Sequence, residues 1–189
     1  AKGEDIDSYQ LLDRLAAEVP IGANGLLFLP YLMGERSPIL DEKSRGVFFG
    51  LSAVHTKYDM LRAVMEGVVY SQRSCLDILR EMHAVPERML ACGGGGTSPL
   101  WRQMLADNYC CPVQTVENRE GPALGAALMA GVGAGIYPDL PTACSRVVRY
   151  HEQQLPDGNA ECAYTKFYQI YKQLYPALKN SFRSLAVLR

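Results

Sequence analysis

The chain has 189 residues, of which 48% are hydrophobic, and it carries a formal net charge of −1 at pH 7. This length and composition predict a globular chain of one domain or slightly more, and the charge excludes the basic field that nucleic-acid binding requires. No apolar run approaches the roughly 20 residues of a membrane span, and no signal peptide opens the chain, so we expect a cytoplasmic protein without a membrane partner.

Hydrophobic periodicity and the placing of glycine and proline predict alternating helices and strands. The predicted helices span residues 10–18, 59–82, 99–108, 121–133 and 161–183. The predicted strands span residues 26–29, 47–51, 89–91 and 112–116, with a loop at 31–46 and an extended segment at 147–157. Alternation of this kind predicts an α/β fold.

The strand at 89–91 is expected to pair in parallel with the strand at 112–116, because a helix connects them. The helices expected to cover this sheet are 59–82, 99–108 and 121–133. Pro176 should kink or restart the last helix. The aromatic side chains of that helix are expected to form an adhesive surface wherever they are not packed.

Six cysteines favour reduced thiols over disulfides or metal binding, because none of them forms a C-x-x-C pair. They are Cys75, Cys92, Cys110, Cys111, Cys144 and Cys162. The adjacent pair Cys110–Cys111 is interpreted as a helix end that runs into a strand, with a redox pair as the alternative.

Four glycines, residues 93–96, separate the strand at 89–91 from the helix at 99–108 and form the most informative part of the chain. Ser98 is expected to be the N-cap of that helix, and Pro99 is a favoured first helical residue. A turn without side chains lets a flat or anionic ligand press against the backbone. A tight turn chosen only for packing is the alternative, but four glycines before a capped helix favour a nucleotide site.

Other polar residues carry weaker signals. Glu35 and Arg36 could form an ion pair at a cleft or a solvated loop pair. Glu66 is placed on an exposed helix face, with a buried arginine partner as the alternative, and Asp107 and Glu117 are interpreted as helix and strand-end residues rather than catalytic carboxylates. The histidines stand far apart without ligand spacing, so they are assigned no metal or general-base role: His55, His83 and His151.

Several motifs in order resemble one family. Residues 46–51, followed by 59–66, resemble the second signature of the FGGY carbohydrate kinases. Residues 28–38 (FLPYLMGERSP) and 94–107 are similar to the xylulose kinase branch of that family. Residues 121–127 look like its late helix and 171–182 like its C-terminal helix, so the resemblance runs from about residue 25 nearly to the C-terminus.

This resemblance implies a two-domain kinase of the actin and hexokinase (ribonuclease H-like) fold, in which the first domain carries the sugar and the second carries ATP. Residues 1–189 would then be the C-terminal part of the second, nucleotide-binding domain without its opening strands, ending in a helix at 161–183. The family's first phosphate loop, its sugar-binding residues and its catalytic aspartate would lie upstream. We therefore expect this chain alone to be inactive.

The activity implied is the ATP-dependent phosphorylation of a sugar, D-xylulose to D-xylulose 5-phosphate, with gluconate or another polyol as the alternative substrate. The resemblance places the purine and ribose of ATP against Gly94, Gly95 and Gly96. Ser98 would donate a hydrogen bond to the nucleotide or serve only as a helix cap, and Gly50 would approach the phosphates or simply end a strand. Mg²⁺ would act on the phosphates, and no metal ligand is assigned in this chain.

The implied partner is the N-terminal sugar-binding domain of the same kinase. A domain without its opening strands should also expose a sheet edge and an apolar interface, so we expect the chain to bind its missing half or to self-associate as a homo-oligomer.

Two other classes of function stay open. The pattern Gly93-x-Gly95-x-x-Ser98 is one residue from a dinucleotide fingerprint, and Glu117 stands roughly where a ribose-binding acid belongs, which would indicate a fragment of an NAD-dependent oxidoreductase. A regulatory or assembly remnant that keeps the fold without the chemistry is the non-enzyme alternative.

Overall fold

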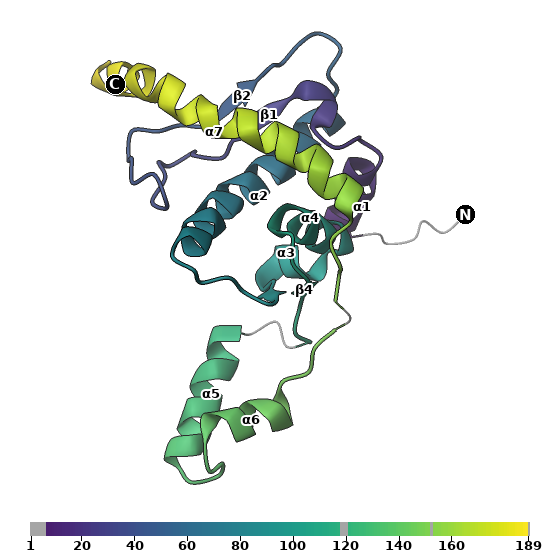
Figure 1. The fold of residues 1–189 in the computed structure, drawn as a ribbon, viewed down its shortest axis with the longest axis vertical. Coiled ribbons are helices and arrows are strands. Elements are labelled where there is room, and N and C mark those ends of the chain that lie inside the picture. The colour runs from purple at the N-terminus through teal and green to yellow at the C-terminus, as the bar shows by residue number, and fades with distance from the viewer. Residues whose placement is uncertain (1–6, 118–120, 152, 189) are drawn as a thin grey trace.

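The structure is a computed structural model that describes residues 7–117, 121–151 and 153–188. Its helices are α1 (Ser8–Ala17), a 3₁₀ turn η1 (Ala23–Gly25), α2 (Lys57–Glu81), α3 (Gly93–Thr97), α4 (Pro99–Tyr109), α5 (Gly121–Gly133), α6 (Leu140–Val147) and α7 (Gly158–Val187). Its strands are β1 (Leu27–Leu29), β2 (Val47–Phe49), β3 (Met89–Leu90) and β4 (Val113–Gln114). Each predicted helix and strand is present, and Figure 1 shows α2 and α7 as the two long helices of the main body.

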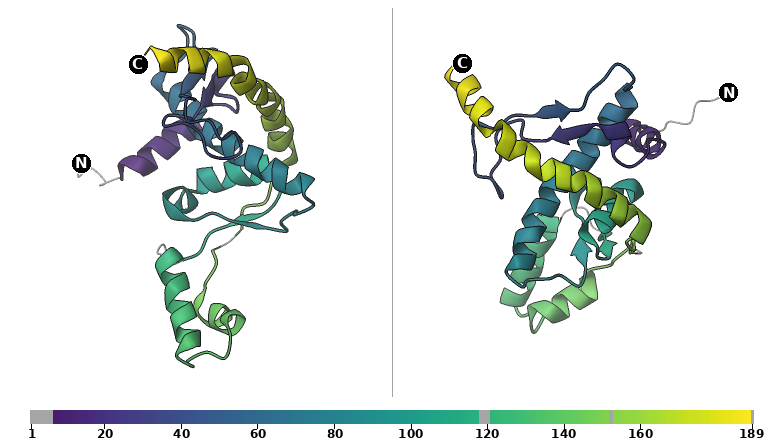
Figure 2. Two further views of the ribbon diagram at one scale, coloured as in Figure 1. Left: turned by 90° about the vertical axis from the view of Figure 1, so that its left-hand side faces the viewer. Right: turned by 45° about the horizontal axis from the view of Figure 1, so that its top comes forward.

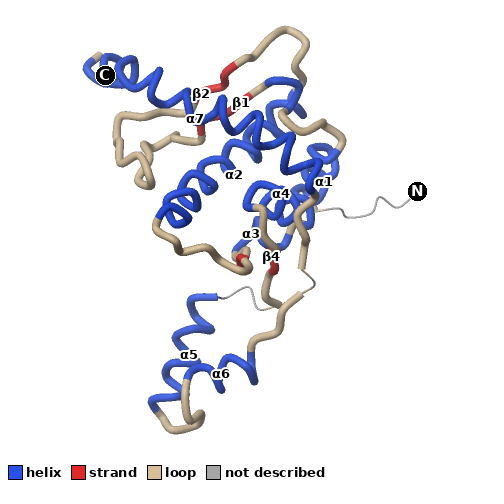
Figure 3. The backbone as a smooth tube through the Cα atoms, in the orientation of Figure 1, coloured by secondary structure: helices blue, strands red, loops and turns tan. Residues whose placement is uncertain are grey.

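The strands of the described ranges form two separate two-stranded sheets, which Figure 3 marks in red. β1 and β2 pair antiparallel, with Leu27 opposite Phe49. β3 and β4 pair in parallel, with Met89 opposite Val113, and α4 lies between them in the chain. This strand–helix–strand unit with parallel strands confirms the predicted pairing and the α/β class.

The segment after α6 is extended, as predicted, and it runs along β4: Gln154 bridges Val113 and Tyr150 bridges Val116, both antiparallel. The helix α6 before it was not predicted. Asp139 caps α6 by accepting a hydrogen bond from Thr142 N at 2.7 Å, with a proline in the first turn. An acidic N-cap followed by a proline in the first turn is a signal for the start of a helix, so the start of α6 can be predicted from the sequence.

The prediction that the helices at 59–82 and 121–133 cover the β3–β4 sheet is wrong, because α2 packs chiefly on β1 of the other sheet. α5 packs chiefly against α6, and Figure 2 shows this pair of helices extending away from the rest of the described chain. Gly135, at φ +74°, turns the chain back so that α6 returns along α5. Gly131 then lies so close to the Tyr137 ring that a Cβ there would come within 3.0 Å of it.

The aromatic face of α7 belongs to the core. Tyr164, Tyr168 and Tyr171 are almost completely buried, and each packs against Tyr70 of α2, with ring centroids 5.3 Å apart for Tyr70 and Tyr171. Because these three tyrosines are packed, they are not part of the adhesive surface that we expect of unpacked aromatic side chains. α7 continues through Pro176, and no helix in the described ranges is both long and apolar enough to cross a membrane.

Glu66 is buried, with 1% of its side chain exposed, so its predicted place on an exposed helix face is wrong and the alternative of a buried arginine partner is right. Arg62 Nε donates to Glu66 Oε1 at 2.7 Å, and Gly22 N donates to both carboxylate oxygens at 3.1 Å. Arg62 Nη2 also donates to the hydroxyl of Tyr164 at 2.6 Å. Burial raises the pKa of Glu66, and the Arg62 guanidinium opposes that rise.

Candidate functional site

The glycine run is not the open turn that we expected. Residues Gly93–Thr97 form the short helix α3 between β3 and α4. Gly93 enters it at φ +73°, a backbone conformation that glycine adopts without steric cost. Within the run, Thr97 Oγ1 donates to the Gly94 carbonyl oxygen at 2.7 Å, and Ser98 N donates to that of Gly95 at 3.3 Å.

Ser98 has the capping role that the sequence predicts. Its Oγ accepts a hydrogen bond from Trp101 N at 3.2 Å, and Pro99 occupies the first turn of α4. The Ser98 side chain is buried at this junction, which ties α3 to α4. A hydrogen bond from its hydroxyl to a nucleotide stays a prediction.

Two of the four glycines are required by the fold. A Cβ on Gly96 would lie 2.4 Å from the Ala91 carbonyl oxygen, and Gly93 needs its positive φ. Gly94 and Gly95 are different: no atom in the described ranges lies within 4 Å of a Cβ on Gly94, and a Cβ on Gly95 would meet only Trp101, at 3.8 Å. Both are exposed. Since alanine is about 1 kcal/mol better than glycine in a helix, these two glycines keep a bare backbone surface that the fold itself does not need.

Gly50 has a structural reason for its identity. It follows β2 at φ +87°, and a Cβ there would lie 2.6 Å from the Gly25 carbonyl oxygen. It belongs to the end of the β1–β2 sheet, whereas the glycine run follows β3 of the other sheet. Its approach to the phosphates therefore stays a prediction without support from its own geometry.

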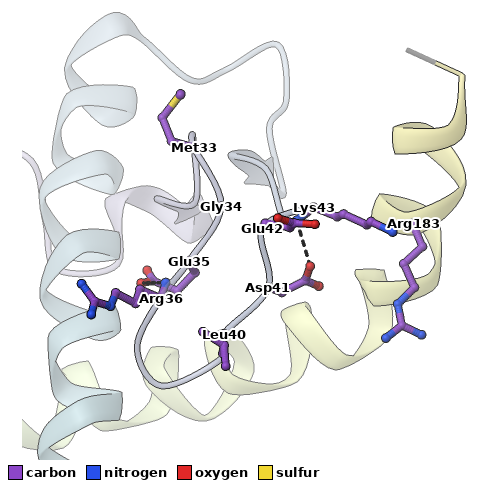
Figure 4. Close-up of a pocket in the computed structure, with 9 residues that line it drawn as sticks. All are labelled: Met33, Gly34, Glu35, Arg36, Leu40, Asp41, Glu42, Lys43 and Arg183. Carbon is purple, nitrogen blue, oxygen red and sulfur yellow. Dashed lines mark hydrogen bonds between the residues drawn. The ribbon is translucent and has the colours of Figure 1, made fainter.

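The predicted loop at 31–46 surrounds a hollow of about 590 Å³, whose lining Figure 4 shows. It is lined by Met33, Gly34, Glu35, Arg36, Leu40, Asp41, Glu42, Lys43 and Arg183. Asp41 accepts hydrogen bonds from the Tyr175 hydroxyl at 2.8 Å and from Lys43 N at 2.9 Å, and the hydrogen bond from Tyr175 holds the pKa of Asp41 below its usual range. The hollow contains none of the predicted nucleotide-binding residues, and this carboxylate serves to fix the loop on α7.

Glu35 also fixes the loop rather than pairing with its neighbour. Its Oε1 accepts hydrogen bonds from the backbone N–H groups of Arg36 and Ser37 at 2.8 and 3.1 Å. Its Oε2 accepts one from Ser71 Oγ of α2 at 3.3 Å. Among the described residues no ion pair joins Glu35 to Arg36, so the ion-pair interpretation is not supported.

The cysteines were predicted to be reduced thiols, and the structure shows them unpaired. All six cysteines are free, and Cys110, at φ +51°, ends α4, which agrees with the helix-end interpretation of the Cys110–Cys111 pair. Burial and the nearby Glu161 raise the pKa of Cys110 to about 11, so its reactive thiolate is scarce at neutral pH. Within the described ranges, no group of three or more histidine, cysteine or acidic side chains could hold a metal ion.

Residues 1–134 match the family model of the C-terminal domain of the FGGY family of carbohydrate kinases. The chain belongs to this family. It is 36% identical over 174 residues to a xylulose kinase from Staphylococcus epidermidis, covering 92% of this chain and 35% of that protein. It is 35% identical over 187 residues to a gluconokinase from Bacillus licheniformis, covering 98% of this chain and 36% of that protein.

Solved structures of FGGY kinases agree with the fold. A ligand-bound xylulose kinase from Lactobacillus acidophilus superposes with a TM-score of 0.85 at 30% identity, covering 96% of this chain and 36% of that one. A gluconate kinase from the same organism superposes with a TM-score of 0.84 at 30% identity, covering 97% of this chain and 37% of that one. A glycerol kinase from Plasmodium falciparum with ADP superposes with a TM-score of 0.77 at 19% identity, covering 92% of this chain and 34% of that one. At this low identity the likeness shows the fold alone.

These comparisons confirm the family resemblance and the actin/hexokinase-like fold that it implied. The FGGY match also favours the kinase interpretation over a fragment of an NAD-dependent oxidoreductase. The chain spans only about 35% of the length of the relatives that it matches.

Proposed function

We propose that the chain is the nucleotide-binding part of an ATP-dependent sugar kinase, and that the bare backbone of Gly94 and Gly95 receives the purine and ribose of the nucleotide. The observation that carries this proposal is that both glycines are exposed and neither is required by the fold. A planar ring can lie directly on a peptide that has no Cβ, so a glycine kept at a helical cost is explained by a ligand that needs the space. Gly96, which follows the pair, is buried against the Ala91 carbonyl group, and Ser98 caps the helix α4 that comes next.

The rest of the machinery lies, in this proposal, in the upstream part of the protein. Phosphoryl transfer requires positioning and charge neutralisation more than covalent chemistry: a carboxylate base on the attacking hydroxyl, Mg²⁺ on the phosphates and donors around the nucleotide. Mg²⁺ would be held chiefly by the nucleotide phosphates, as is usual for kinases, and this proposal assigns it no ligand in the chain. The N-terminal sugar-binding domain would supply the base and the sugar contacts.

The substrate that we propose is D-xylulose, phosphorylated to D-xylulose 5-phosphate. Its support is the segment 28–38, which resembles the xylulose kinase branch, together with the xylulose kinases among the chain's relatives. Gluconate is the second candidate, because gluconokinases match the chain at a similar identity.

Ligand-dependent melting of the complete protein, with its upstream part present, tests the nucleotide class. We expect ATP and ADP to raise the melting temperature and NAD to leave it unchanged, because binding to the native state alone stabilises that state. Turnover is then measured with D-xylulose and gluconate. Stronger stabilisation by NAD would overturn the kinase assignment, and nucleotide binding without turnover of any sugar would indicate a regulatory remnant.

The 189-residue chain alone is expected to show no sugar kinase turnover. A general base contributes about a hundred- to ten-thousand-fold to such a reaction, and positioning of the sugar contributes more. ADP release from the purified chain with ATP, Mg²⁺ and D-xylulose should equal the rate without sugar and should rise when the separately expressed upstream part is added. Sugar-dependent ADP release by the chain alone would contradict the proposed division between the two parts.

A further inference from the structure

The helix α3 cannot maintain its shape by itself. Four of its five residues are glycine, which is the least favourable helix residue apart from proline because its backbone loses the most freedom on ordering. A helix of five residues is also too short to be stable in isolation. The conformation of the glycine run must therefore be held by contacts from outside it.

Arg102 of α4 provides such a contact. Its Nη1 donates to the Gly96 carbonyl oxygen at 2.8 Å, while its own backbone N donates to the Ser98 carbonyl oxygen at 3.1 Å. The guanidinium of Arg102 in α4 is thus bound to a carbonyl group of α3. The side chain is half-buried, so its donors are partly shielded from competing water.

Of the four glycines, Gly96, to which Arg102 donates, has the least space around its Cβ position. Gly96 is buried against the Ala91 carbonyl group, and that carbonyl oxygen accepts a hydrogen bond from Thr115 Oγ1 at 2.8 Å. Gly96 therefore lies close against the Ala91 carbonyl group, which follows β3, and its own carbonyl oxygen accepts the hydrogen bond from Arg102. Gly94 and Gly95, immediately before it, keep their outer faces open.

We propose that Arg102 is a positioning residue that holds Gly96 and thereby keeps the backbone of Gly94 and Gly95 in the conformation that accepts the nucleotide. Arg102 acts through the Gly96 carbonyl group and not by touching the nucleotide. This inference rests on the proposed function of the glycine run. Without the guanidinium, the run samples more backbone conformations, and only the fraction in the competent conformation binds, so the apparent affinity falls by that fraction.

The test compares Arg102→Met with Arg80→Met in the complete protein. Methionine keeps much of the aliphatic length but has no donor. Arg80 is the matched control, because its Nη2 donates to the carbonyl oxygen of Tyr109, at the opposite end of the same helix α4. The readouts are the ADP dissociation constant by calorimetry, the KM values for ATP and for the sugar, and hydrogen exchange of the peptide that contains residues 93–97.

For Arg102→Met we expect about tenfold weaker ADP binding, a matching rise in the KM for ATP, a KM for the sugar within twofold of the parent value, and faster exchange at residues 93–97. Arg80→Met should leave ADP binding and this exchange unchanged. Arg102→Lys, which keeps a charged donor group on a shorter side chain, should show about a threefold loss of ADP affinity. If the methionine variant does not fold, the lysine variant makes the same comparison.

Unchanged exchange at residues 93–97 in the folded Arg102 variants would overturn the inference, as would an equal loss of ADP affinity in Arg80→Met. Substitution of Gly95 separates this failure from failure of the proposed function. ADP binding that is lost in Gly95→Val but retained in the Arg102 variants would refute the role of Arg102 alone. ADP binding that persists in Gly95→Val and also in the Arg102 variants would refute the proposed nucleotide site, and with it the role of Arg102.

Discussion

Replacement of Gly95 by valine in the complete protein is expected to reduce the affinity for ATP and ADP at least a hundredfold and to leave sugar binding nearly intact. A Cβ at this position meets only Trp101, at 3.8 Å, so the side chain is tolerated by the described fold and extends into the space proposed for the nucleotide. A β-branched side chain also prevents a planar ring from lying on the peptide. Calorimetric titration with ADP, and separately with the sugar, measures both affinities.

Gly133→Val is the matched control for this substitution. Gly133 is an exposed glycine in a helix, and no atom in the described ranges lies within 4 Å of its Cβ position, but it is at the end of α5, far along the chain from the glycine run. Both variants replace an exposed helical glycine by valine, so only Gly95→Val should lose nucleotide. An ADP affinity that is unchanged in Gly95→Val, or reduced equally in both variants, would refute the assignment.

Substitution of Glu66 by glutamine is expected to lower the free energy of unfolding of the chain by about 3 kcal/mol, because removal of one member of a buried ion pair leaves the other charge uncompensated. Arg62 is 5% exposed and would keep its charge beside a neutral amide. The backbone N–H of Gly22, which donates to both oxygens of Glu66, would also meet the amide nitrogen of glutamine, which cannot accept. Urea unfolding followed by circular dichroism measures the change.

Asp77→Asn provides the comparison on the same helix. Asp77 and Arg80 form a partly exposed pair with oxygen and nitrogen 3.4 Å apart, and such pairs contribute about 0–1 kcal/mol. Asparagine can still accept the hydrogen bond that the Tyr168 hydroxyl donates to Asp77. Equal losses in the Glu66 and Asp77 variants would contradict the account of the buried pair.

Local signals in the sequence predicted most of the helices. The apolar periodicity of α2 and the Ser98–Pro99 pair at the start of α4 correspond to the observed elements. The start of α2 was placed two residues late, although Thr56 and Asp59 form a capping box that is visible in the sequence. The position of this helix start is therefore encoded in the local sequence.

Other features depend on contacts between distant segments and could not be predicted in this way. Glu66 is buried, and its carboxylate accepts hydrogen bonds from the backbone N–H of Gly22, which lies 44 residues earlier in the chain. The position of α5 depends on the return of the chain at Gly135. Sequence analysis identified the glycine run as a candidate site but missed Arg102, because the contact from its guanidinium to Gly96 exists only once α3 has formed.

A crystal structure of the complete protein with ADP tests the central claim most directly. We predict that the purine and ribose lie against the exposed backbone of Gly94 and Gly95, with Gly96 still bound to the Arg102 guanidinium beneath them. A nucleotide bound elsewhere in the protein, with Gly94 and Gly95 open to solvent, would contradict the account.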